Sequence, residues 1–436
     1  MAPLLMVLGA LLLVSCVVSL GFGPARVPVA VVWDILLNKA FRVGDVHWTP
    51  GQEHIVWLIR VPRLLLGALV GAGLALIGAV LQAVTRNPLA DPHLLGVTSG
   101  ATLGAVIVVL HVGEIVGLLT LPLAAFIGAL LSMLLVLTIA ARQGRLESDR
   151  LLLCGVAVSF VMMAAANLLL FLGDHRASSA VMFWMLGGLG LARWELLAVP
   201  AASVVLGLVL LLGMARPLNA LMAGEQTAVT LGLNAAKVRL WIFLIASLMT
   251  GVLVSISGSI GFVGLMVPHI ARRLVGAEHR RLLPACVLLG SLFLVWVDVA
   301  ARTLIAPEDL PIGVATAAIG GLFFSSDSCG VAERRLFPDH KKITCGSELA
   351  RDGDGSVKLA VTDTPLSRAS SLPQGHRNSL APMWRTSSHQ PPQRAHSWCN
   401  RSCTSHANPA FQSLPPTGHT PCKSACSVCI CPQKNS

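Results

Sequence analysis

Residues 64–84 read LLLGALVGAGLALIGAVLQAV, a run of apolar and small residues that contains no charge. An α-helix rises about 1.5 Å per residue, so about 20 such residues are needed to cross the roughly 30 Å hydrocarbon layer of a membrane. This run is therefore long enough to span a bilayer. Nine further apolar runs follow or precede it, at Pro3–Gly21, Leu94–Val112, Ile115–Ala140, Leu151–Leu172, Leu196–Met214, Leu240–Ser255, Ile260–Val267, Leu282–Ala301 and Ile312–Phe324.

These ten runs predict an all-α, polytopic membrane protein with ten transmembrane helices. Two of the runs are too short to span. The eighth, Ile260–Val267, ends at Pro268 and follows several small polar residues, which predicts a broken helix that is buried among its neighbours. The tenth, Ile312–Phe324, is followed by the polar sequence SSDS at 325–328, which predicts a truncated helix.

The composition of the 436-residue chain supports the same class. Hydrophobic residues make up 54% of the chain and charged residues only 12%, about half of the ~25% that is usual in soluble proteins. A single soluble core could not cover so much apolar surface, and disorder of the whole chain is excluded for the same reason. The net charge of +11 would suggest nucleic acid as a partner, but more than half of it lies in residues 325–436, so no nucleic acid is expected.

The chain is expected to change character near residue 325. Residues 1–324 form the predicted transmembrane domain. Residues 325–436 are rich in Ser, Pro, Arg, His and Cys and show no amphipathic period, so we predict a disordered tail that results from a frameshift near codon 325. A zinc module and disulfides are the alternatives for this tail, but the four candidate thiols are too crowded to leave a core, at Cys422, Cys426, Cys429 and Cys431.

Basic residues orient the predicted bundle, because cytoplasmic loops carry an excess of Lys and Arg. If the N-terminus is cytoplasmic, the inner connections hold eleven basic residues and the outer connections hold eight, several of them in the long connection 23–61. The sequence therefore predicts an inward N-terminus and places Arg60, Arg63 and Arg302 on the outer side.

Several loop motifs are more specific than the runs around them. They are RVPR at 60–63, QAVTRNPLADPHLLGVTSGA at 82–101, GSIGFVGLMVPHIAR at 258–272, and the pair DVAAR at 298–302 and LPIG at 310–313. Together and in this order they closely resemble the permease subunits of binding-protein-dependent ABC importers for iron chelates, haem and cobalamin, the FecCD family. The resemblance covers about residues 1–324, and its motif positions are Asn87, Pro88, Asp91, Pro92, Gly261, Pro268 and His269.

The resemblance implies a ten-helix subunit of the cell inner membrane that pairs with a second permease as a homodimer or heterodimer. It also implies two cytoplasmic ATPase subunits and a periplasmic substrate-binding protein as partners. Such a permease has no catalytic residues, and the sequence contains no G-x-x-x-x-G-K-[ST] phosphate loop. ATP is therefore expected to be handled by another chain, and neither a cofactor nor a metal site is expected in this one.

The connection at residues 217–234 is far less apolar than its flanks. Its two glycines permit sharp turns, so two short helices joined at a glycine are predicted here. Such a pair could insert into a groove of a partner, and the resemblance implies that the ATPase docks at this place; an ordinary amphipathic loop is the alternative. The residues assigned to the ATPase-coupling loop are Leu221, Gly224, Glu225, Leu231 and Gly232.

Arg60, Arg63 and Arg302 are candidates for contact with the binding protein. Fixed cations at an outer rim would orient an acidic partner, and in the family matching arginines meet carboxylates of the binding protein. The alternative is an arginine that snorkels to the membrane interface. Asp298 precedes Arg302 by four residues, which predicts an i, i+4 ion pair; a proton relay at this carboxylate is the alternative.

Two smaller assignments complete the candidate sites. The resemblance implies that Ser148 and Asp149 narrow the pathway as a cytoplasmic gate, whereas Ser or Asp at that place would also cap an ordinary helix. His269 is expected to be structural, because no second His or Cys stands at metal-binding spacing near it.

The cargo cannot be inferred from an apolar lining. The segment Phe183–Gly190 resembles a periplasmic segment that occurs in family permeases for both iron chelates and cobalamin. We expect an iron–siderophore complex or haem because that branch of the family is the larger one, and cobalamin is the alternative. An ion-coupled secondary transporter is the competing class; it needs intramembrane carboxylates and repeat symmetry, and the sequence offers one candidate carboxylate, Asp298.

Overall fold

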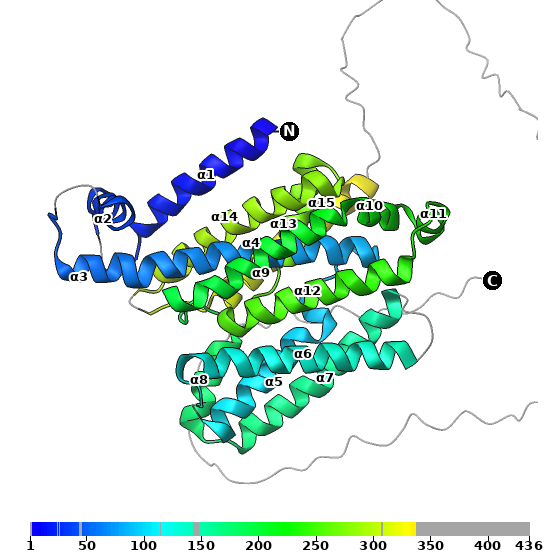
Figure 1. Cartoon of the computed structure of the whole chain (residues 1–436), viewed down its shortest axis with the longest axis horizontal. Coiled ribbons are helices and arrows are strands. Elements are labelled where there is room, and N and C mark those ends of the chain that lie inside the picture. The colour runs from blue at the N-terminus through cyan, green and yellow to red at the C-terminus, as the bar shows by residue number, and fades with distance from the viewer. Residues whose placement is uncertain are drawn as a thin grey trace, which may run out of the picture. The chain divides into compact units, whose positions relative to one another are not determined.

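The computed structural model describes residues 2–336 except residues 24, 26, 43–45, 114, 143–147 and 307. Among these residues the regular elements are all helices, which confirms the all-α class (Figure 1). Seven helices in this part of the chain are long and apolar enough to cross a membrane, and two apolar helices are shorter. A count of ten is therefore not confirmed. Most of the predicted tail, with its zinc and frameshift hypotheses, lies outside the described residues.

The helices follow one another in a simple order. The long spans are α1 (Ala2–Leu20), the continuous helix Pro50–Thr85, α6 (Thr120–Arg142), α7 (Ser148–Leu172), α9 (Trp194–Gly213), α12 (Ala235–Ser257) and α14 (His279–Thr303). The shorter elements include α2 (Val29–Phe41), η2 (Pro92–Leu95), α5 (Val97–Ile107), α8 (His175–Met185), α10 (Ala215–Ala223), α11 (Glu225–Thr230) and α13 (Val263–Val275). Helix α15 (Ile312–Leu336) is long, but its apolar part is the shorter stretch Ile312–Ser326.

The second span begins earlier than the sequence predicts. The segments α3 (Pro50–Glu53), η1 (His54–Arg60) and α4 (Val61–Thr85) run on as one helix. Thr49 starts it with a capping box, in which its hydroxyl accepts from the Gln52 N–H and the Gln52 side chain accepts from the Thr49 N–H. The π-helical stretch η1 ends at Arg60, two residues before Pro62, where a regular α-helical turn would crowd the proline ring. The arginines of the RVPR motif therefore lie within a helix and not in a connection.

The α4 helix is the centre of the bundle and is buried along nearly its whole length. Helices α9, α12, α13 and α14 pack around it (Figure 1). A Cβ added at Gly71 would overlap the backbone carbonyl of Gly290 on α14, and one added at Gly78 would overlap that of Gly264 on α13. Glycine thus lets these backbones touch directly, which is how helices pack when lipid removes the hydrophobic drive between them.

A second group consists of α5, α6 and α7, which pack on one another (Figure 1). Gly100 on α5 and Gly128 on α6 face each other so closely that a Cβ on either would overlap the other's backbone carbonyl. Helix α12 contacts both α4 and α6 and so joins the two groups.

Three predicted boundaries are wrong. The run Leu94–Val112 does not form one span, because Pro92–Leu95 forms a separate 3-10 turn that ends at Gly96 with φ 79°. The helix expected to end at Pro268 passes through it to Val275. The tenth helix does not end at Phe324 but continues to Leu336, since the hydroxyls of Ser325 and Ser326 bond back to carbonyls of their own helix and so are accommodated within it.

Two helices lie where the sequence analysis placed connections. Helix α2 is amphipathic, with Val32 and Ile35 buried while Asp34 and Lys39 are exposed. Helix α8 follows α7 after a short break. Both are too short to span a membrane, so a search for long apolar runs passes over them.

The close contact of α4 with α14 makes a testable prediction for stability. Gly71→Ala forces the two backbones apart, and we expect it to lower the free energy of unfolding by about 1–3 kcal/mol, as overpacked cores do. Gly9→Ala on α1 is the matched control, because nothing lies within 4 Å of its added Cβ; it should be neutral or slightly stabilising. Thermal unfolding of the purified protein in detergent measures both. Equal melting temperatures for the two variants would contradict the assigned contact.

Candidate functional site

The two longest sequence motifs lie against each other in the fold. Asn87 accepts a hydrogen bond from the Leu89 N–H at 2.9 Å, and Asp91 accepts one from the His93 N–H at 2.9 Å, so each side chain closes a tight turn after α4. Nε2 of His93 lies 3.2 Å from the carbonyl oxygen of Ile260 in the second motif. The turns with Pro88 and Pro92 thus carry the first motif onto the connection between α12 and α13.

Gln82 explains how α13 passes through a proline. Pro268 has no N–H to donate to the carbonyl of Gly264, four residues before it. Nε2 of Gln82, a residue of α4 that is 5% exposed, donates to that carbonyl at 3.0 Å. The Gln82 Oε1 in turn accepts from Nη1 of Arg272 at 2.6 Å. The run was expected to end at Pro268 because nothing in its own sequence supplies the missing donor; a side chain 182 residues away supplies it.

The remaining motif residues have structural contacts. The ring of His269 meets that of Phe323 edge-on with centroids 5.9 Å apart, which ties α13 to α15. A Cβ at Gly261 would make only ordinary contact with His93 at 3.5 Å. No group of three or more His, Cys, Asp or Glu that could hold a metal ion occurs among the described residues.

A cavity of about 610 Å³ opens beside this junction. Its lining is mostly apolar and comes from both motifs, from the end of α8 and from α15; the polar members are Asp91, His93 and Ser259. A second cavity of about 330 Å³ shares His93 and Ser259 with the first and extends along α5 and α7. Backbone hydrogen bonds from Gly188 to Ser257 and from Ile312 to Gly187, both 2.9 Å, hold these walls together.

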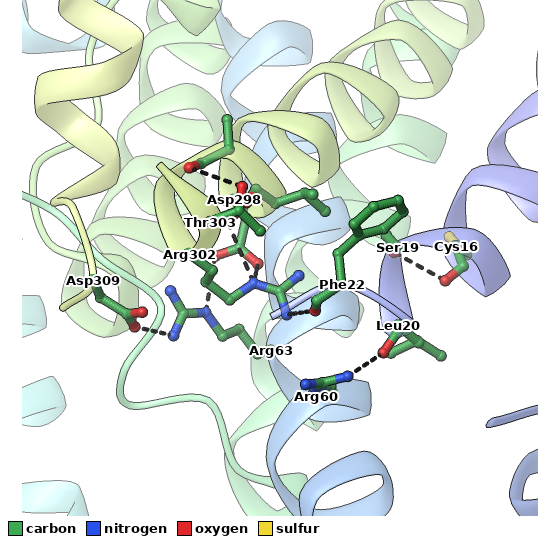
Figure 2. Close-up of polar contacts among 12 residues, drawn as sticks. Cys16, Ser19, Leu20, Phe22, Arg60, Arg63, Asp298, Arg302, Thr303 and Asp309 are labelled. Carbon is green, nitrogen blue, oxygen red and sulfur yellow. Dashed lines mark hydrogen bonds and ion pairs between the residues drawn. The ribbon is translucent and has the colours of Figure 1, made fainter. Parts of the chain in front are cut away.

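At the far end of α4 lies a group that we call the arginine cluster, namely Arg60, Arg63, Asp298, Arg302 and Asp309 (Figure 2). One oxygen of Asp298 pairs with Nε of Arg63 at 2.8 Å, and the other pairs with Nε of Arg302 at 2.9 Å. The i, i+4 pair predicted from spacing is thereby confirmed. Nη1 of Arg63 also pairs with Asp309 at 2.5 Å. The contacts of Arg63 were not predicted, because they join residues 235 and 246 positions apart.

The arginines of the cluster point inward. Arg60 is 4% exposed and donates to the carbonyls of Leu20, at 2.6 Å, and Ala25. Nη1 of Arg302 donates to the carbonyl of Phe22 at 3.2 Å. These guanidinium groups therefore fasten the connection that follows α1 onto the continuous helix Pro50–Thr85 and onto α14 (Figure 2). The half-exposed member of the cluster is Asp309, whose side chain is 46% exposed.

At the opposite end of the bundle, α10 and α11 meet at Gly224, which has φ 129° (Figure 1). This is the pair of short helices joined at a glycine that the sequence predicts, and Gly232 follows with φ 75°. Leu221 is buried and anchors α10 to the bundle, whereas Leu231 is 66% exposed. Glu225 lies 3.7 Å from Arg239, which ties α11 to α12.

The predicted gate lies at the start of α7. Ser148 and Asp149 are the first residues of this helix, and residues 143–147 before them lie outside the described part of the chain. The side chains of the two gate residues are likewise not described, so the gate stays a prediction.

Comparisons with known proteins agree with these motifs. The model of the FecCD transport family matches residues 11–326. A hemin transport system permease protein of Yersinia pestis is 37% identical over 325 residues, which cover 73% of this chain and 94% of that protein. A cobalamin import system permease protein of Halobacterium salinarum is 43% identical over 270 residues, covering 62% of this chain and 72% of the relative. A solved ABC transporter, described as of the metal-chelate type and inward-facing, is 32% identical with a TM-score of 0.66, over 75% of this chain and 98% of that one.

The role of Gln82 is tested by a double-mutant cycle. Gln82→Leu leaves the carbonyl of Gly264 unpaired in an apolar bundle and should cost about 1–3 kcal/mol of stability. Pro268→Ala restores a backbone donor to the same oxygen, so Gln82→Leu should cost clearly less in the Pro268→Ala background. Thermal unfolding of the four proteins gives the coupling. Strict additivity would show that the two residues do not share this carbonyl.

The arginine cluster is tested by comparing its two carboxylates. Asp298→Asn removes the buried partner of two arginines and should cost about 3–5 kcal/mol, as breaking buried ion pairs does. Asp309→Asn removes a half-exposed partner and should cost about 0–1 kcal/mol. Chemical or thermal unfolding in detergent measures the difference. Equal losses would contradict the assignment of Asp298 as the centre of the cluster.

Proposed function

The chain belongs to the FecCD transport family and is an ABC importer permease of the inner membrane, and we propose that its cargo is an iron–siderophore complex or haem. The relative named as a hemin permease, which aligns over nearly its full length, supports this cargo. Cobalamin is the second candidate, favoured by the relative named for cobalamin import. A cavity of about 610 Å³ with a mainly apolar lining is of the size that holds a large organic ligand, and a lining with few polar groups suits cargo that must also leave.

The proposed assembly combines permease, ATPase and binding-protein subunits. This chain pairs with a second permease, identical or homologous, and two cytoplasmic ATPase subunits and a periplasmic binding protein complete it. Helix α7 is the surface proposed for this pairing, because Phe160 and Phe171 are 73% and 83% exposed on it. Large apolar side chains at these positions need lipid or another helix as a neighbour.

The ATPase docks, in this proposal, on α10 and α11. Helix α10 is anchored through buried Leu221, while half-exposed Glu225 begins α11 and exposed Leu231 follows its last residue. A short, rigidly based helix pair with an exposed apolar end suits insertion into a groove of a partner. Gly224 and Gly232, both at positive φ, set the turns on either side of α11.

The binding protein docks, in this proposal, at the end of the bundle that holds the arginine cluster, with Arg60, Arg63 and Arg302 as the cations. Because their guanidinium groups already bond to carbonyls and to Asp298, an acidic partner would gain access to Arg63 by competing with half-exposed Asp309. Ser148 and Asp149 are proposed as the gate at the other end. If the docking site or the gate were assigned wrongly, the chain would still be a permease.

An ion-coupled secondary transporter finds little support in these contacts. Its candidate proton carrier, Asp298, is 2% exposed, and each of its carboxylate oxygens pairs with a different arginine. A carboxylate that is paired in this way holds α4 and α14 together and is not available to carry a proton.

The ATPase contact is tested by Leu231→Asp. A carboxylate placed on the exposed apolar end of α11 should reduce co-purification of the ATPase subunits at least about tenfold, the effect of roughly 1.4 kcal/mol lost from an interface. Val46→Asp is the matched control, because Val46 is equally exposed, at 64%, in the connection between α2 and α3. Loss of the ATPase with both variants, or with neither, would refute the proposed docking site.

The cargo is tested by uptake into proteoliposomes that contain the full transporter. The chain is assembled with its partner ATPase and binding protein, and accumulation of haem, a ferric siderophore and cyanocobalamin is measured with and without ATP. The proposal expects ATP-dependent accumulation of haem or the ferric siderophore. Accumulation of cyanocobalamin alone would show that cobalamin is the cargo in place of haem or a siderophore. Accumulation without ATP would refute the assignment as an ATP-driven importer.

A further inference from the structure

A partly buried side-chain contact joins α10 to the first residue of α14. Asn219 lies on α10, and His279 begins α14 and is 0% exposed. The Asn219 Oδ1 lies 3.1 Å from the backbone N of His279 and 2.5 Å from Nδ1 of its ring. One amide oxygen therefore meets two atoms of the same residue, 60 positions away in the chain.

The chemistry of this contact fixes the protonation of the ring. A backbone N–H can only donate, so the Asn219 atom that faces it must be the oxygen. That oxygen can only accept, so the ring atom beside it must be the protonated Nδ1. Nε2 then carries the lone pair, and it is buried without a hydrogen-bond partner. The imidazole is thus held in one tautomer with both donors of His279 aimed at Asn219.

The same contact is a helix cap supplied by another helix. The first N–H groups of an α-helix have no partner within the helix and carry its positive end. Glu278, the residue before α14, makes no side-chain cap. Asn219 fills this role from α10, so a displacement of α10 acts directly on the end of α14.

Helix α14 is well placed to carry such a displacement. The backbones of Gly71 and Gly290 touch, and the Ser291 hydroxyl donates to the Ala68 carbonyl at 2.8 Å, so α14 and α4 are fastened together at mid-length. At its other end α14 bears Asp298 and Arg302 of the arginine cluster. One rigid helix pair therefore connects α10 with the cluster.

We propose that Asn219 and His279 are the positioning residues through which α10 drives the α4–α14 pair when the ATPase moves. This rests on the proposed function, in which α10 belongs to the ATPase-docking element. The contact is distinct from docking itself, because Asn219 faces the bundle while Leu231 is exposed at the end of α11. Breaking it should therefore uncouple ATP hydrolysis from transport without releasing the ATPase.

The test uses the full transporter in proteoliposomes, with whichever of haem, a ferric siderophore or cyanocobalamin the wild-type chain accumulates. Asn219→Leu keeps the size of the side chain and removes the acceptor. We expect it to retain the ATPase subunits and ATP hydrolysis, while cargo moved per ATP falls about tenfold, corresponding to roughly 1.4 kcal/mol of lost coupling. Asn219→Asp retains an acceptor for both donors and should restore the ratio to within about twofold.

Thr49→Val is the matched control. It removes the side-chain cap of α3, a loss of similar size that involves no second helix, and should leave cargo moved per ATP unchanged. A normal ratio in Asn219→Leu, or a failure of Asn219→Asp to restore it, would overturn the inference while leaving the permease function standing. A wild-type chain that binds no ATPase would overturn the proposed function first.

A second measurement leaves the contact intact and so does not depend on the folding of a variant. Spin labels are placed at Arg216 on α10 and Arg280 on α14, both exposed. If α10 and α14 move together, the distance between the labels should stay constant within about 2 Å through the ATP cycle, well below the ~5.4 Å of a one-turn shift. A distance that changes by a helical turn would overturn the inference.

Discussion

The direct contact of three helix backbones at glycines is the constraint on which the rest of the structure depends. On α4, Gly71 faces Gly290 of α14 and Gly78 faces Gly264 of α13. At Gly71 and at Gly78 there is no room for a Cβ. In lipid, helices gain little from hiding apolar side chains, so close backbone packing and hydrogen bonds hold them together. The approach at Gly78 also brings Gln82 of α4 within reach of the carbonyl that Pro268 leaves free on α13. The hydrogen bond that Pro268 cannot make within α13 is thereby replaced by one from the neighbouring helix.

Pairs of polar side chains connect the same helices along the length of the bundle. Gln82 and Arg272 pair across α4 and α13, Asp298 pairs with arginines of α4 and α14, and Asn219 caps α14 from α10. An unpaired polar group in an apolar medium costs several kcal/mol, so each of these pairs fixes a register between helices more sharply than apolar contact would. The arrangement couples the end that holds α10 and α11 to the end that holds the arginine cluster.

The sequence was sufficient for features that depend on neighbouring residues. Length and composition predicted the all-α membrane class, a glycine within a polar stretch predicted two short helices that meet at Gly224, and a four-residue spacing predicted the Asp298–Arg302 pair. The sequence was not sufficient where contacts between residues far apart in the chain determine the local structure. Pro268 looks like a helix end until Gln82 is brought to Gly264, and the pairing of Arg63 with Asp298 and Asp309 joins residues far apart in the chain. Helices α2 and α8 escaped notice because they are amphipathic or short, and neither property stands out against long apolar runs.

The central claim is that α4 and α14 behave as one body during transport. The most direct test is a reversible covalent tie between them, made by Ala68→Cys together with Ser291→Cys, at positions whose side chain and backbone already touch. With the full transporter in proteoliposomes, ATP-driven uptake should be the same after oxidation of this pair as after its reduction. Uptake that stops on oxidation and returns on reduction would show that the two helices must separate, and would contradict the account.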